Sequence, residues 1–220
     1  MHDPTIFILS TLGALAVVGA VFYLTSLARQ KRSAALAEVA ARMGFTFEPT
    51  VEDARLSSLG PFHLFTRGHR RVGRNLMTGK ADAGPVILLD YQYTVGGGKD
   101  SQTYQQTVAI FQEVTGLPDF TLAPEHLWHR IGSLFGYQDI DFEASEEFSK
   151  HYLLRGPDES AIRATFGAEA LGFFAQSKGW SVEAAGGAVA VYRGGKRAKP
   201  DEYQPFLAET AAVRRALSRA

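Results

Sequence analysis

Residues 86–114 read VILLDYQYTVGGGKDSQTYQQTVAIFQEV, in which two runs rich in β-branched and aromatic residues flank the segment 96–100. Two such runs separated by a short glycine-rich segment predict a β-hairpin. Side chains alternate between the two faces of a strand, which places Leu89, Tyr91, Tyr93 and Val95 on one face and Leu88, Asp90, Gln92 and Thr94 on the other. We expect the first face to be buried and the second to be solvated, as is usual in an antiparallel sheet.

Shorter strand patterns on both sides of this hairpin extend the predicted sheet. They cover 45–47, 63–66 and 72–77 before it, and 120–122, 140–142 and 148–154 after it. A second hairpin is predicted from 180–183 and 188–192. Apolar residues at helical spacing predict helices around 36–43, 124–135, 162–166, 171–174 and 206–217, and Asp158 is placed to cap the third of them. Because strands and helices do not alternate regularly, the predicted fold class is α+β, with a mainly antiparallel sheet and packed helices.

The N-terminal segment predicts a membrane anchor. The 25 residues between Asp3 and Arg29 carry no formal charge and are mostly Ile, Leu, Val, Ala and Phe. About 20 helical residues cross the hydrocarbon core of a bilayer, so this stretch is long enough to span it. A cleaved signal peptide would carry Lys or Arg before a shorter apolar run, whereas the N-terminus here has only His2 and Asp3. We therefore expect a retained transmembrane helix within residues 1–28.

The residues that follow the apolar stretch predict its orientation. Arg29, Lys31 and Arg32 come directly after it, and positive residues stay on the cytoplasmic side of a membrane. We expect the N-terminus to lie outside, the rest of the chain to lie in the cytoplasm, and these three side chains to lie at the lipid headgroups. One face of the anchor carries the small residues Gly13, Ala16 and Ala20. Small side chains permit close helix–helix contact, so a homo-oligomer is one alternative.

Composition limits what the remaining residues can be. The 220-residue chain has 23 basic and 23 acidic side chains, whereas a nucleic-acid binder needs an excess of positive charge. The absence of cysteine excludes disulfides, thiolate nucleophiles and cysteine-ligated metals. We expect a strand-rich α+β part over 29–136 and a second α+β part over 137–220, which form either one domain or two.

Two motifs invite comparison with nucleotide and metal sites. Gly96–Lys99 reads GGGK, but a phosphate-binding loop needs a glycine at position 93 and Ser or Thr after the lysine. Tyr93 and Asp100 stand there instead, so this segment is interpreted as a hairpin turn. Glu125, His126 and His129 form an EHxxH group, but on the predicted helix it lies on the solvent side with an arginine beside it. Neither motif predicts a nucleotide or metal site.

Acidic side chains alternate with apolar ones at Asp139, Asp141 and Glu143. This pattern is typical of the solvated face of an edge strand, where charge also discourages aggregation. Neither the nucleophile-elbow pattern of hydrolases nor a dinucleotide fingerprint occurs in the sequence. We therefore predict no catalytic residue, no cofactor and no bound metal.

Asp90 is the one carboxylate in an otherwise apolar run. Such a residue either pairs with a polar group across the sheet or marks an unfamiliar enzyme site. A basic cluster is predicted at the turn before it, where Arg67, Arg70, Arg71 and Arg74 crowd together. In a domain held next to a bilayer, these side chains would contact anionic headgroups or a partner, or else remain a solvated turn.

The chain resembles uncharacterised single-pass bacterial membrane proteins that are known only as domains of unknown function. The resemblance is carried by five short segments, which are Asn75–Met77, Asp90–Thr94, Leu117–Phe120, Asp139–Phe142 and Phe148–Tyr152. It covers most of the chain after the anchor and implies a bacterial inner membrane. Such families have no established active residues, so the resemblance implies no site.

Together these observations predict a membrane-anchored cytoplasmic binding or scaffold domain. Its expected partners are the lipid bilayer and other membrane or cytoplasmic proteins. The alternative is a membrane-tethered enzyme with an unrecognised active site near Asp90 or the group Glu125–His129.

Overall fold

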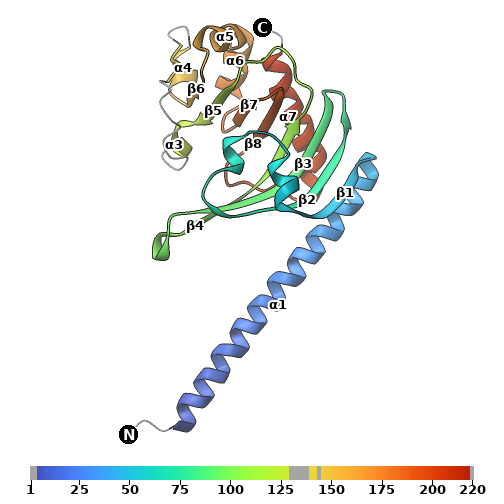
Figure 1. The fold of residues 1–220 in the computed structure, drawn as a ribbon, viewed down its shortest axis with the longest axis vertical. Coiled ribbons are helices and arrows are strands. Elements are labelled where there is room, and N and C mark those ends of the chain that lie inside the picture. The colour runs from blue at the N-terminus through green and yellow to red at the C-terminus, as the bar shows by residue number, and fades with distance from the viewer. Residues whose placement is uncertain (1–3, 129–138, 143–144, 219–220) are drawn as a thin grey trace.

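A long helix and one antiparallel sheet make up the computed structural model, which describes residues 4–128, 139–142 and 145–218. Helix α1 (Pro4–Met43) runs without a break for 40 residues, and its N-terminal half projects from the body of the protein (Figure 1). Its C-terminal part packs into the core, where Leu36 and Ala40 are fully buried. The helix ends before Gly44, whose positive φ of 70° is the left-handed conformation that commonly ends a helix.

The sheet has eight strands in the order β1-β2-β3-β4-β8-β7-β5-β6, and all neighbouring strands are antiparallel. The strands are β1 (Thr46–Val51), β2 (His69–Ala81), β3 (Gly84–Val95), β4 (Gln102–Phe111), β5 (Phe120–Pro124), β6 (Tyr152–Arg155), β7 (Ser181–Ala185) and β8 (Ala188–Tyr192). Strands from both predicted parts of the chain, 29–136 and 137–220, therefore lie in one sheet. They are joined by the pairing of β4 with β8 and by the pairings of β5 with β6 and with β7.

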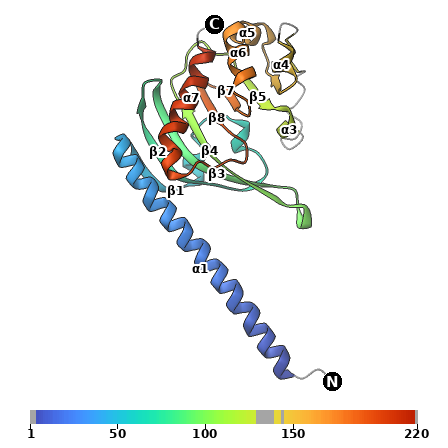
Figure 2. The same ribbon diagram turned by 180° about the vertical axis from the view of Figure 1, so that it is seen from behind.

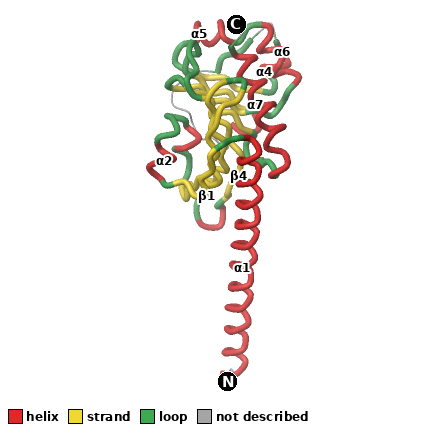
Figure 3. Tube along the Cα trace, turned by 90° about the vertical axis from the view of Figure 1, so that its right-hand side faces the viewer, coloured by secondary structure: helices red, strands yellow, loops and turns green. Residues whose placement is uncertain are grey.

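Helices cover the two faces of the sheet unequally. The C-terminal part of α1 and helix α7 (Tyr203–Leu217) lie on the face seen in Figure 2, together with α6 (Ala168–Gln176). The opposite face is covered by the segment that holds α2 (Asp53–Ser57) and the 3-10 turn His63–Phe65 (Figure 3). Five shorter helical segments complete the described part of the fold: the 3-10 turn Gly98–Asp100, α3 (Glu125–Trp128), α4 (Glu146–Ser149), α5 (Glu159–Thr165) and the 3-10 turn Pro200–Glu202.

Both faces of the central strands are buried, contrary to the expectation of one solvated face. Leu89, Tyr91 and Tyr93 pack in the cluster under α2, as expected for the buried face. Leu88, on the predicted solvated face, is fully buried in the larger cluster under the helices. The expectation of a solvated face was wrong because α1 and α7, which are distant in sequence, cover it.

The two hairpins, β3–β4 and β7–β8, are confirmed, as is the α+β class. The strand predicted at 63–66 is instead a 3-10 turn, because Leu64 and Phe65 are adjacent and both buried in the same cluster. A strand would point them to opposite faces. The segment 148–154 divides into the end of α4 and strand β6, and 139–142 is a loop held beside β6 by the hydrogen bond from Ile140 N to Leu154 O.

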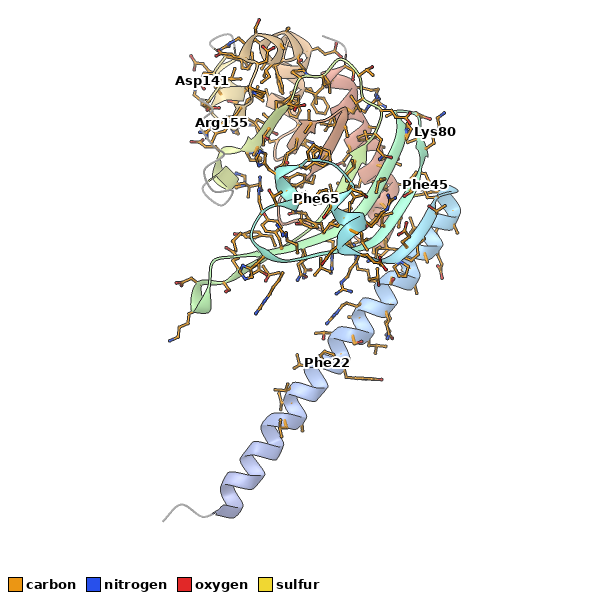
Figure 4. All side chains as sticks on the ribbon, viewed as in Figure 1. Phe22, Phe45, Phe65, Lys80, Asp141 and Arg155 are labelled. Carbon is orange, nitrogen blue, oxygen red and sulfur yellow. The ribbon has the colours of Figure 1, made fainter. Side chains whose placement is uncertain are left out.

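The projecting part of α1 exposes large apolar side chains. Val17, Phe22 and Leu24 are more than 60 % exposed, and Phe22 stands away from the body in Figure 4. Within the described residues, no helix was found that meets the combined length and hydropathy requirements of a membrane span.

Leu36→Ala should lower the free energy of unfolding by about 2–5 kcal/mol, because it leaves a cavity between α1 and the sheet. Leu24→Ala, on the exposed part of the same helix, is the matched control and should change stability little. Denaturation of the full chain in detergent measures both. Equal effects would contradict the packing of Leu36 between α1 and the sheet.

Candidate functional site

A buried ion pair joins α1 to the centre of the sheet. Asp90 lies in β3 on the helix-covered face and is 5 % exposed. Arg32, from α1, donates two hydrogen bonds to it, from Nε to Oδ2 and from Nη2 to Oδ1, both 2.8 Å long. This bidentate geometry is the strongest form of pairing between a guanidinium and a carboxylate.

Three further side chains complete the surroundings of the Asp90 carboxylate. Asn75 Nδ2 donates to Oδ2 at 2.9 Å, and Tyr203 OH and Thr107 Oγ1 donate to Oδ1 at 2.9 and 3.3 Å. Asn75 has a positive φ of 52° and lies in an irregular stretch of β2 between Arg74 and Met77. The described residues thus give Asp90 five hydrogen bonds, and they tie α1, the sheet and α7 to one carboxylate.

Burial fixes the protonation of this network. Burial raises the pKa of the Tyr203 hydroxyl well above its usual range, and the negative charge of Asp90 raises it further. Burial alone would lower the pKa of Arg32, but its hydrogen bond to Asp90 and the charge of Asp90 give a net increase. Arg32 therefore remains charged and Tyr203 remains a neutral hydrogen-bond donor.

These contacts match the expectation that Asp90 pairs with polar groups across the sheet, and they correct one expectation for Arg32. Asp90 pairs with polar groups, and its oxygens are occupied by internal donors. The Arg32 side chain is only 14 % exposed, so it does not extend toward headgroups as expected. Arg29 and Lys31 are exposed, on the part of α1 that leaves the body.

A cavity of about 400 Å³ opens beside this network, between α1 and the end of the sheet. We call it the junction pocket. Its lining residues are Thr25, Ala28, Arg29 and Arg32 from α1, Val72 and Arg74 from β2, Asp90, Tyr91 and Gln92 from β3, Gln105 from β4, and Arg197 from the loop after β8. Four arginines and one aspartate give the lining an excess of positive charge.

Three of these arginines are not neutralised by Asp90. Arg74 and Arg197 have no hydrogen bond or ion pair to any residue that the structure describes. Among the described residues, Arg29 hydrogen-bonds only within its own helix, to Thr25 O at 3.3 Å and to Thr25 Oγ1 at 3.5 Å. The junction pocket therefore holds available cationic donors, as an anion-binding site requires.

The predicted basic cluster at 67–74 is divided in the structure. Arg67 is buried on the α2-covered face, and its Nη2 lies 3.7 Å from Glu183 Oε1. Arg70 and Arg71 are exposed, and Arg71 Nη1 donates to Thr66 O at 3.0 Å. Arg74 lines the junction pocket on the other face of the sheet. Arg67 is thus unavailable for the contact with headgroups or partners that was expected of it.

Glu183 forms a second buried polar centre, which the sequence analysis missed. It accepts hydrogen bonds from Tyr192 OH at 2.8 Å and Leu64 N at 3.1 Å. Burial, followed by the charge of Glu183, raises the pKa of Tyr192 well above its usual range. Glu183 is the lone carboxylate in the apolar strand SVEAA, which is the signal that identified Asp90.

Within the part of the chain that the structure describes, the remaining sequence motifs do not assemble a site. The segment 96–100 is the exposed turn of the β3–β4 hairpin. His129 and Glu143 fall outside the described residues, and within those residues no group of three potential metal ligands occurs. The Asp139 carboxylate accepts the amides of Ile140 and Leu154, and burial raises its pKa.

Comparisons with known proteins give one likeness of fold. No family model matches the sequence, and no curated protein matches it. The crystal structure of the mycobacterial trehalose monomycolate transport factor A, TtfA, superposes with a TM-score of 0.60 at 11 % sequence identity. The match covers 86 % of this chain and 94 % of that one, so the two chains share their fold over nearly their whole length.

Arg32→Met should lower the free energy of unfolding by about 3–5 kcal/mol, because it leaves the charge of Asp90 buried and unpaired. Arg29→Met, one turn earlier and exposed, is the control and should have little effect. Adding Asp90→Leu to Arg32→Met should cost less than the sum of the single changes. Additive costs in denaturation experiments would show that the two side chains are not coupled.

The contribution of the buried tyrosines to the free energy of unfolding should be constant up to about pH 10 and fall above it. Burial raises the pKa values of Tyr91, Tyr152, Tyr192 and Tyr203, so their unfolded forms lose protons at lower pH than their folded forms. The stabilisation is complete below the unfolded pKa and is lost as pH rises past it. Denaturation across the alkaline range measures this decline.

The decline should become shallower in Tyr192→Phe and remain unchanged in Tyr23→Phe, since Tyr23 is 66 % exposed. Tyrosinate absorbance should show a group of tyrosines that ionise only when the protein unfolds. Full ionisation in the folded protein would contradict the burial of these hydroxyls.

Proposed function

We propose that this chain is a membrane-anchored binding module, with the sheet domain on the cytoplasmic side of a bacterial inner membrane. The observation that carries the proposal is the division of α1 into two parts. One part packs into the core through Leu36, Val39 and Ala40, and the other projects with exposed apolar side chains. Water is an unfavourable environment for such a surface, and a bilayer is a favourable one.

The length of α1 supports a span. Its 40 residues extend about 60 Å, of which about 30 Å would cross the hydrocarbon core. The uncharged stretch up to Ala28 supplies that length, and the part that packs in the core begins about two turns beyond its end, at Leu36. The domain would therefore lie directly against the membrane surface.

The charges next to this stretch support the orientation. Arg29 and Lys31 are exposed immediately beyond the apolar residues, where positive side chains favour the cytoplasmic side. Arg32 stabilises the attachment of the helix to the domain instead of contributing to the exposed charge.

The chemistry of the two buried carboxylates favours binding over catalysis. A general acid or base must reach a proton of the substrate. Asp90 and Glu183 instead accept hydrogen bonds from internal donors. The structural neighbour is described as a transport factor, and this supports an accessory binding role without identifying a ligand for this chain.

The full chain should remain with the membrane fraction after an alkaline carbonate wash. Replacing Val17 and Val21 with aspartate should release it, because each central charge costs about 2.5–3.5 kcal/mol of insertion. Ala34→Asp, beyond the apolar stretch and exposed, is the control and should not change the distribution.

A reporter fused after Ala220 tests the orientation. Green fluorescent protein fused at this position should be fluorescent. Alkaline phosphatase fused at the same position should be inactive, because it requires export. Active alkaline phosphatase would overturn the orientation, and release of the unmodified chain by carbonate would overturn the anchor.

A further inference from the structure

We propose that the junction pocket binds the phosphate of an anionic phospholipid headgroup. This inference rests on the proposed anchoring of α1, because that anchoring places the pocket at the bilayer surface. Four observations support it: the position of the pocket along α1, its available charge, its lining, and the part of the fold that lies beside it.

The position of the pocket matches the depth of a lipid phosphate. Its α1 lining runs from Thr25 to Arg32, so it begins in the last turn of the uncharged stretch and extends about one turn beyond it. Headgroups occupy this region when the preceding residues span the hydrocarbon core. Leu24, immediately before the pocket, is 61 % exposed and available to acyl chains.

The charge of the pocket is arranged for an anion. Arg32 and Asp90 neutralise each other, which leaves Arg29, Arg74 and Arg197 on three separate segments around the cavity. Arg74 is the register partner of Asp90 in the β2–β3 pairing, but Asp90 hydrogen-bonds to Arg32. A phosphate oxygen would supply Arg74 and Arg197 with the acceptors that the described residues do not.

The lining also provides neutral donors beside this charge. Gln105 Nε2 donates to Gln92 Oε1 at 2.9 Å, which fixes the two amides across β3 and β4. The Nε2 of Gln92 then remains to donate to a phosphate or glycerol oxygen. Ala28 and Val72 add apolar wall, as is common in ligand pockets of this size.

The domain presents a second contact to the same surface. The turn of the β3–β4 hairpin lies at the end of the body from which α1 projects (Figures 1 and 3). Lys99 is exposed at this turn. A bilayer that surrounds the N-terminal half of α1 would therefore face both the pocket and the hairpin turn.

Native mass spectrometry of the full chain in detergent tests the proposal. Phosphatidylglycerol is the anionic probe, phosphatidylcholine is the zwitterionic one, and free glycerol 3-phosphate represents a soluble phosphate. We expect the wild-type chain to retain phosphatidylglycerol in preference to the other two. In Arg74→Gln/Arg197→Gln, its affinity should fall roughly 10- to 30-fold, at about 1 kcal/mol per charge.

Arg55→Gln/Arg215→Gln is the matched control, because it removes the same charge from two exposed arginines outside the pocket. Equal loss in both double variants, or no loss in either, would overturn the pocket as the binding site. Preferential binding of glycerol 3-phosphate would overturn the lipid as its source.

Failure of this inference and failure of the anchor can be distinguished. The lipid probe is added to the chain in detergent solution, where no bilayer is present. Lipid binding to the pocket is therefore measured independently of whether α1 spans a membrane. A chain that resists carbonate but binds no phosphatidylglycerol would overturn only the headgroup site.

Discussion

The pairing of Arg32 with Asp90 is the interaction on which the arrangement of this protein depends. It links the helix that leaves the domain to the middle of the sheet, and Tyr203 adds α7 to the same carboxylate. The apolar packing of Leu36, Val39 and Ala40 is non-directional. A bidentate pair, by contrast, has one geometry, so it specifies where the helix lies.

The opposite face of the sheet also has a buried carboxylate that is hydrogen-bonded to the segment that covers it. There, Glu183 accepts hydrogen bonds from Tyr192 OH in the neighbouring strand and from the amide of Leu64 in the covering segment. Arg67 Nη2 lies near the same carboxylate. Each covering layer is thus joined to the sheet by one buried carboxylate. Such pairs contribute specificity more than stability, because desolvation offsets most of their attraction.

Local patterns in the sequence were sufficient to predict most of the fold. They predicted little of the candidate site. Both hairpins and the Asp158 cap depend on neighbouring residues, and they were predicted correctly. Arg32 and Asp90 are 58 positions apart, and no local pattern indicates that they meet. For the same reason the covered face of β3 was expected to be solvated, and Arg74 was grouped with Arg67 although the two lie on opposite faces.

Because α1 is one unbroken helix, its projecting half is mechanically coupled to the sheet domain. A hinge between a membrane span and a domain lets each turn independently, but here one continuous helix enters the core and ends only at Met43. In the proposed anchored state, tilt or axial rotation of the N-terminal half would be transmitted directly to the sheet. Each helical residue rotates the chain by about 100° around the helix axis. In the proposed anchored state, the spacing between Ala28 and Arg32 would therefore determine which side of the domain faces along the membrane plane.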